Sequence, residues 1–172
     1  MRPRRVMFGM LLLAVVLLGY WSGRLWYRNA QMARSLHSTI TTHLYLAATD
    51  ALMAEHLFAQ SDKHLAFAKL DNASSNLMRA ELATELLNKL GGDRSKRVQT
   101  LLWIYAQEVQ GIKMGAYING SIDASHYSLL EDISHDLEIV ATLCARPNGV
   151  NSLEIDLLSG IRVRKARQFL FK

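Results

Sequence analysis

The stretch VMFGMLLLAVVLLGYWSGRLW, residues 6–26, is the feature that decides the fold. From Val6 to Tyr20 every residue is apolar, glycine or tyrosine, and the only charge in the stretch is Arg24. About 20 such residues in a helix cross the hydrocarbon layer of a bilayer, so the stretch predicts one transmembrane helix. The side chains that we expect to contact lipid are Val6, Met10, Leu11, Leu12, Leu13, Val15, Val16, Leu17, Leu18, Trp21 and Trp26.

A cleaved signal peptide and a buried core helix are two other interpretations of this stretch. The arginines within residues 2–5, followed by an apolar run, fit the start of a signal peptide. Cleavage, however, needs small residues at alternate positions. The small residues Gly19, Ser22 and Gly23 each have a bulky residue two positions upstream. We therefore predict an uncleaved signal anchor.

The arginines on the two sides of the span leave its orientation more open than its insertion. Three arginines precede the span within residues 2–5, and three more, Arg24, Arg28 and Arg34, lie at its far end and beyond. The leading arginines are concentrated in a very short tail beside the first apolar helix, which favours a cytoplasmic N-terminus. The sequence therefore predicts a single-pass protein of the cell membrane with an extracytoplasmic C-terminal domain.

Charge is unevenly distributed along the 172 residues, whose net charge is +5. Residues 1–27 hold four arginines and no acid, residues 28–161 hold 11 basic and 15 acidic residues, and residues 162–172 hold five basic residues and no acid. A mildly acidic body argues against a nucleic-acid-binding face. The expected partners are the lipid bilayer and either another protein or a second copy of the chain, and not nucleic acid.

Beyond the span, apolar residues recur every three or four positions, which is the pattern of amphipathic helices. Turn signals at Ser61–Asp62, Gly91–Gly92, Asn119–Gly120 and Pro147–Gly149 separate four such stripes, although the first break is weak and one long helix is the alternative. The predicted core positions are Leu36, Ile40, Leu44, Ala47, Ala51, Ala54, Phe58, Leu70, Ala73, Leu77, Ala80, Thr84, Leu87, Val98, Leu101, Leu102, Tyr105, Val109, Ile112, Ala116, Leu130, Ile133, Leu137, Val140 and Cys144.

These stripes predict an all-α chain in three parts. Residues 1–27 are a short basic N-terminus and the transmembrane anchor. Residues 28–146 form an antiparallel domain that resembles a four-helix bundle, because short connections make neighbouring helices antiparallel. Residues 147–172 are a turn, a short helix and a basic, amphipathic tail. The narrow stripe of residues 70–87 has the strict heptad spacing of coiled coils.

The basic tail combines cations with a closing pair of aromatic residues. Near a bilayer each cation is worth about 1 kcal/mol against anionic headgroups, and aromatic rings insert at the interface. The residues that we predict to contact a membrane surface or a partner are Arg162, Arg164, Lys165, Arg167, Phe169 and Phe171. Two alternatives stay open, which are docking on the acidic body and a frayed, solvated tail.

The titratable residues form no pattern typical of catalysis or of metal binding. None of the six histidines belongs to the pair of Glu-x-x-His motifs that di-metal bundles use, and no phosphate-binding loop, dinucleotide fingerprint or serine elbow occurs. The nearest cluster surrounds Asp132 and His135, with Glu131 and Asp136 beside them, and we interpret it as a solvated acidic patch. The sequence therefore predicts no enzyme, no metal and no cofactor.

Two remaining features bear on function. Cys144 lies on an apolar stripe, so we expect a buried, inert thiol. Gly111 and Gly115 interrupt one helix, which indicates either a close helix approach, a hinge or small pocket, or a tolerated local weakness. The main functional hypothesis is a scaffold or accessory subunit of a membrane complex, and the alternative is a sensory or small-ligand-binding bundle.

Overall fold

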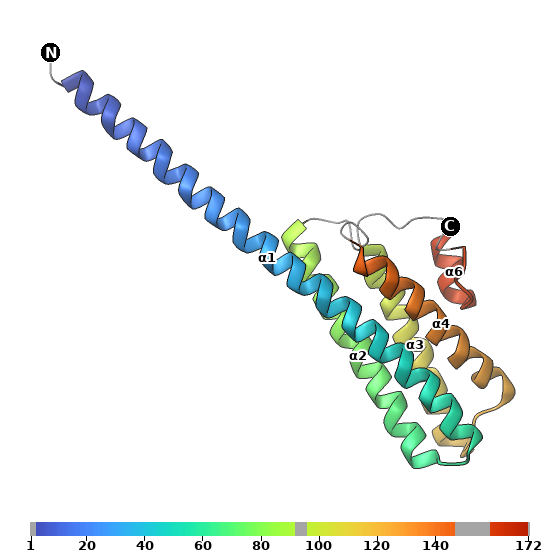
Figure 1. Ribbon diagram of the computed structural model, residues 1–172. Helices are drawn as coiled ribbons and strands as arrows, with labels where there is room; N and C mark the ends of the chain where they lie inside the picture. The colour runs from blue at the N-terminus through green and yellow to red at the C-terminus, as the bar shows by residue number, and fades with distance from the viewer. Residues whose placement is uncertain (1–2, 92–95, 147–158, 172) are drawn as a thin grey trace. The chain divides into compact units, whose positions relative to one another are not determined.

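The computed structural model describes residues 3–91, 96–146 and 159–171, and side chains are described from Met10 onward. These residues form five α-helices and no strand, which confirms the all-α prediction (Figure 1). The helices are α1 (Pro3–Ala59), α2 (Lys63–Gly91), α3 (Lys96–Asn119), α4 (Ala124–Ala145) and α6 (Arg164–Leu170). The contacts divide the chain into two units, Met1–Ser35 and Leu36–Lys172, and α1 runs through both.

The connections lie at the predicted turn signals. Ser61 adopts a left-handed conformation with φ of 66°, and Asp62 Oδ1 accepts the backbone N–H of Leu65 at 3.2 Å, so α1 and α2 are separate helices rather than one. Gly120 has φ of 67°, and Asp123 Oδ1 caps α4 by accepting the backbone N–H of His126 at 3.0 Å. Each of these caps supplies an acceptor that the first turn of a helix otherwise lacks.

The core of the second unit lies between four helical segments. Figure 1 shows the second half of α1 running beside α2 and α4, in line with the hydrogen bonds from Lys69 of α2 to Asp50 and from Ser134 of α4 to the carbonyl oxygen of Ala48. Almost all predicted core positions are buried, including the fully buried Leu77, Tyr105 and Leu137. Leu36, at the boundary of the two units, is the exception and is partly exposed. The helical periodicity therefore identified the faces that meet in the core.

Buried polar contacts join α1 to its neighbours within the second unit. Asp50 Oδ1 accepts from Lys69 Nζ at 2.9 Å, and Asp50 Oδ2 accepts from Asn76 Nδ2 at 3.3 Å. Asn76 Oδ1 in turn lies 3.0 Å from Nδ1 of the partly buried His43. Because shifting α1 along α2 would separate these partners, the chain of contacts favours one register between the two helices.

Candidate functional site

The large apolar side chains of the first unit lie exposed along α1. From Met10 to Tyr27 their exposed fractions range between 52% and 73%. Within the described ranges, α1 is the one helix that is long and apolar enough to cross a bilayer. It is consistent with a signal anchor or a membrane span, whereas a core helix would have buried these side chains. Val6 belongs to α1, but its side chain lies outside the described part.

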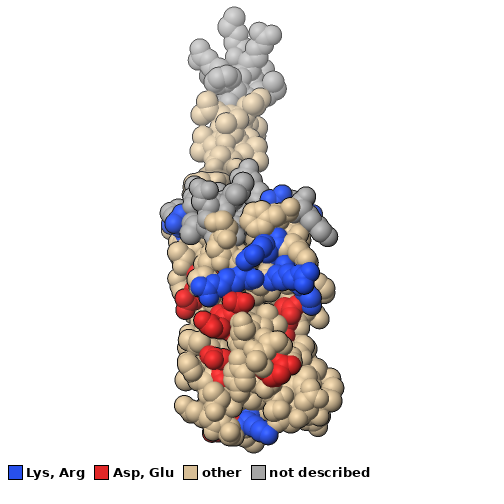
Figure 2. Space-filling view, turned by 90° about the vertical axis from the view of Figure 1, so that its right-hand side faces the viewer, with Lys and Arg blue, Asp and Glu red and all other residues tan. Residues whose placement is uncertain are grey.

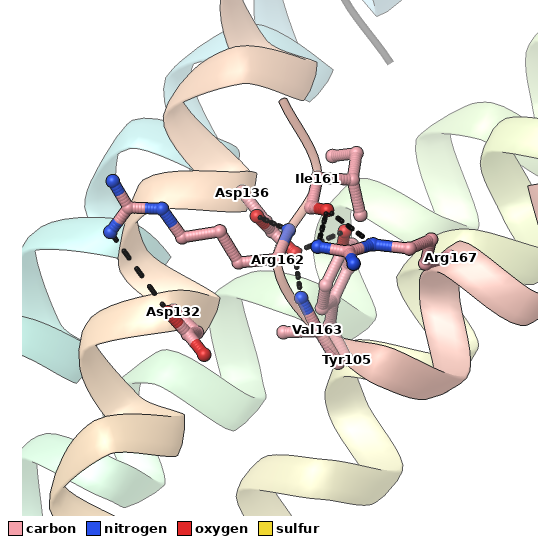
Figure 3. A network of polar contacts seen from close by, with 7 residues as sticks. All are labelled: Tyr105, Asp132, Asp136, Ile161, Arg162, Val163 and Arg167. Carbon is pink, nitrogen blue, oxygen red and sulfur yellow. Dashed lines mark hydrogen bonds and ion pairs between the residues drawn. The ribbon is translucent and has the colours of Figure 1, made fainter. Parts of the chain in front are cut away.

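In the second unit, the most elaborate polar site holds the C-terminal segment against α3 and α4 (Figure 3). Asp136 of α4 is fully buried, and its Oδ1 accepts the backbone N–H of Arg162 at 2.7 Å. Its Oδ2 accepts the backbone N–H of Val163 at 2.9 Å and the hydroxyl of Tyr105 at 3.2 Å. One carboxylate therefore connects α3, α4 and the extended residues that precede α6.

The pKa shifts of Asp136 and Tyr105 indicate that this site has a structural role. Burial raises the pKa of Asp136, while the hydrogen bonds from Arg162, Val163 and Tyr105 act in the opposite direction. Burial raises the pKa of Tyr105 well above its ordinary value, and the charge of Asp136 adds to this effect. Tyr105 therefore keeps its proton and remains a hydrogen-bond donor, rather than serving as a base or a nucleophile.

Apolar and basic residues of the C-terminal segment add to this anchoring. Ile161, Val163 and Ala166 are buried. The guanidinium of Arg167 donates to the carbonyl oxygen of Ile161, from Nε at 3.0 Å and from Nη2 at 2.9 Å. These bonds join the residues that precede α6 to the helix itself. Residues 161–170 are therefore packed on the domain, and the alternative of a frayed tail is wrong.

Two cations of this segment face carboxylates of the body. Lys165 Nζ lies 2.5 Å from Glu108 Oε1, and Arg162 Nη1 lies 4.0 Å from Asp132 Oδ1. Figure 2 shows basic side chains gathered directly beside acidic ones on this face of the molecule. Of the predicted alternatives, the structure therefore shows the one in which the tail docks on the acidic body. Arg164 and Phe171 remain exposed, and a contact of the tail with a membrane or a partner stays a prediction.

The predicted acidic surface patch requires a correction. Glu131 is exposed, and Asp132 and His135 are partly exposed, but Asp136 is fully buried. Asp136 lies beside the core stripe of α4, and the donors that satisfy its oxygens come from residues far along the chain. Within the described residues, no group of three or more His, Cys, Asp and Glu side chains could hold a metal ion.

The structure also bears on the predictions for Cys144 and for the two glycines of α3. Cys144 is buried, as predicted, and burial raises the pKa of its thiol to about 12. A Cβ added at Gly111 would meet no heavy atom within 4 Å, and one at Gly115 would meet only the ring of His126 at 3.5 Å. In the described part of the chain, no backbone of another helix comes within 4 Å of the added Cβ at either glycine, so a tolerated weakness fits better than a close helix approach.

The turn and short helix predicted at the start of residues 147–172 fall mostly on residues 147–158, which lie outside the described residues. Sequence reasoning did not assign a helix to residues 164–170, because the run of cations obscures the buried positions Val163 and Ala166.

No family model, no curated protein and no solved structure matches this chain, so its function is inferred from its own residues.

Proposed function

We propose that this chain is a single-pass membrane protein, anchored by residues 6–26, whose helical domain acts by binding another protein as a scaffold or accessory subunit. The observation that carries the proposal is the run of exposed apolar side chains from Met10 to Leu18. In water such a surface is unfavourable by about 25 cal/mol for each Å² of apolar area, whereas in a bilayer it is solvated by lipid tails.

Residues around this run support a signal anchor with a cytoplasmic N-terminus and an extracytoplasmic domain. Arginines precede the run in a short tail. Tyr20, Trp21, Trp26 and Tyr27 follow it and have the aromatic character of a membrane–water interface. Arg24 lies near enough to the end of the run for its long side chain to reach the headgroups.

The domain after the anchor is proposed to be an antiparallel four-helix bundle that serves in recognition rather than catalysis. Its most elaborate buried polar groups, Asp136 and the Asp50–Asn76 pair, are engaged with backbone or side-chain partners that hold elements together. The thiol of Cys144 is buried with a pKa of about 12, so it does not form a nucleophilic thiolate near neutral pH. Recognition of a protein partner needs only the outer faces of the helices.

A protease-protection experiment on the full chain with a C-terminal tag tests the anchor and its orientation. With the anchoring membrane intact, protease added from outside should remove the tag, and the purified protein should retain residues 1–27 by mass spectrometry. The double variant Leu13→Arg/Val16→Arg should leave the membrane fraction, because each central arginine disfavours insertion by about 2.5–3.5 kcal/mol. Gln107→Arg, on an exposed face of α3, is the matched control and should stay membrane-bound.

Three results would contradict the proposal. A tag that is digested only after the membrane is opened would reverse the orientation. A purified protein that lacks its first residues would make residues 6–26 a cleaved signal peptide. Unchanged membrane association of the double arginine variant would exclude this stretch as the anchor.

A further inference from the structure

An open notch between α2 and α3 combines an aromatic ring with a carboxylate. It has a volume of about 220 Å³ and is lined by Glu81, Gln99, Thr100 and Trp103. Trp103 exposes 53% of its surface, although tryptophan is a large apolar side chain that proteins usually bury. An exposed tryptophan beside a pocket is a common centre of protein interfaces.

Exposed apolar side chains of α2 lie within five positions of Glu81 in the sequence. Met78, Leu82 and Leu86 are exposed and are spaced by four residues, so they share one face of the helix. The core face of α2 contains Leu77, Ala80 and Thr84, which are fully buried. The exposed stripe is therefore additional to the apolar residues that the fold of the domain uses.

Glu81 is the charged residue that lines the notch, and the ionised form of its carboxyl group is disfavoured in the isolated chain. Burial and the neighbouring Glu85 both raise its pKa, with burial the larger cause. Glu85 has a partner, since its Oε1 accepts from Lys89 Nζ at 2.7 Å. Glu81 has no cation paired with it anywhere in the described ranges. A cation placed in the notch would stabilise the ionised carboxylate of Glu81.

We propose that the notch receives an arginine side chain of a partner protein, with its guanidinium paired to Glu81 and stacked on Trp103. This inference rests on the proposed function and names the surface and the chemistry of the partner. The planar guanidinium suits both a carboxylate and an indole face better than the ammonium of lysine does. Met78 and Leu82 would be covered by apolar residues that flank the arginine. Because the notch is acidic, it disfavours an anionic lipid surface.

Photo-cross-linking of the full chain in its own membrane tests the proposal. A benzophenone amino acid is placed at Leu82 for the notch face and, as a control, at the exposed Glu138 on α4. Leu82 should give a product with one partner protein, and mass spectrometry should place the cross-link within one helical turn of an arginine of that partner. Glu138 should not give this product.

Charge variants then separate binding from folding. Glu81→Gln should lower the yield of the Leu82 product about tenfold, because a charge-assisted hydrogen bond is lost. Glu85→Gln, one turn away on the same helix, is the matched control and should change the yield less than about twofold. Glu81→Gln should leave the melting temperature unchanged or raise it, because a partly buried carboxylate without a cation is removed.

Several outcomes would overturn the proposal. These are an unchanged yield in Glu81→Gln, an equal loss in Glu85→Gln, a cross-linked site without a nearby arginine, and a product that is a second copy of the chain. A partner trapped at Glu138 but not at Leu82 would also overturn it while leaving the proposed function in place. A lack of product at both positions would count against the inference and the proposed function together.

Discussion

The backbone N–H of Arg162 donates a 2.7 Å hydrogen bond to Oδ1 of the buried Asp136 and so joins the C-terminal segment to α4. Asp136 also accepts from Val163 and Tyr105, which makes this carboxylate the common anchor of three elements. Because its partners are two backbone amides and a hydroxyl rather than a cation, the anchor depends on geometry more than on opposite charge. The stability of the docked segment can therefore be tested at one residue.

Substitution of Asp136 should release the C-terminal segment. In Asp136→Ala, the amides of Arg162 and Val163 and the hydroxyl of Tyr105 lose their acceptor, and the domain should lose about 1–3 kcal/mol of stability. Limited proteolysis should then cut within residues 161–171 earlier than in the wild type. Asp132→Asn is the control, because its 4.0 Å contact with Arg162 is at the surface and should contribute less than about 1 kcal/mol. Equal protease resistance of Asp136→Ala and the wild type would show that Asp136 does not anchor the segment.

The same residue should contribute a pH dependence. Since burial raises the pKa of Asp136, the folded chain binds this proton more tightly than the unfolded chain does. The contribution of Asp136 to stability is therefore fully present below the unfolded pKa and declines as the pH rises through the folded pKa. Urea unfolding of the full chain in detergent should show a stability difference, wild type minus Asp136→Asn, that is larger near about pH 4 than near about pH 7. A difference that grows with pH would indicate that the folded pKa is lowered instead.

Replacing Gly111 should stabilise the domain. A Cβ at this position meets open space, so Gly111→Ala should raise the free energy of unfolding by up to about 1 kcal/mol through its higher helix propensity. Gly120→Ala is the opposing control, because φ of 67° at Gly120 is strained for an L side chain and should cost about 1 kcal/mol. Thermal unfolding of both variants checks the prediction. A destabilised Gly111→Ala would mean that the glycine is needed for a bend or a contact that the open space does not suggest.

Adjacent residues of α2 should differ sharply in their contribution to stability. Leu77 is fully buried, so Leu77→Ala should destabilise the domain by about 2–5 kcal/mol through lost burial and a residual cavity. Met78, one position later, exposes 63% of its surface, and Met78→Ala should stay within about 0.5 kcal/mol of the wild type. Urea unfolding measures both differences. Similar losses for the two variants would contradict the assignment of the two faces of α2.

Local signals explain why the helices could be predicted from the sequence. The heptad positions of residues 70–87 and the stripe from Val98 to Ala116 are buried as their spacing indicates. The turns at Ser61–Asp62 and at Gly120 follow from residues that cap helices or accept positive φ. Each of these signals depends on residues within a few positions of one another. The chain can therefore specify them before any tertiary contact forms.

The site around Asp136 could be decided only by the tertiary structure. Taken alone, an aspartate between His135 and Leu137 and close to Glu131 and Asp132 reads as part of a solvated patch, because an unpaired buried carboxylate is strongly unfavourable. The amides of Arg162 and Val163 make burial acceptable, and they lie 26 and 27 residues away. The docking site of the basic tail could not be predicted for the same reason. Composition alone does not distinguish a membrane surface, a partner protein and the acidic body as the contact of the tail. The sequence by itself determined the apolar run, the four long helices and their buried faces, since these depend on local spacing and hydrophobicity. The docking of the C-terminal segment depends on where distant polar groups meet, and only the folded chain decides that.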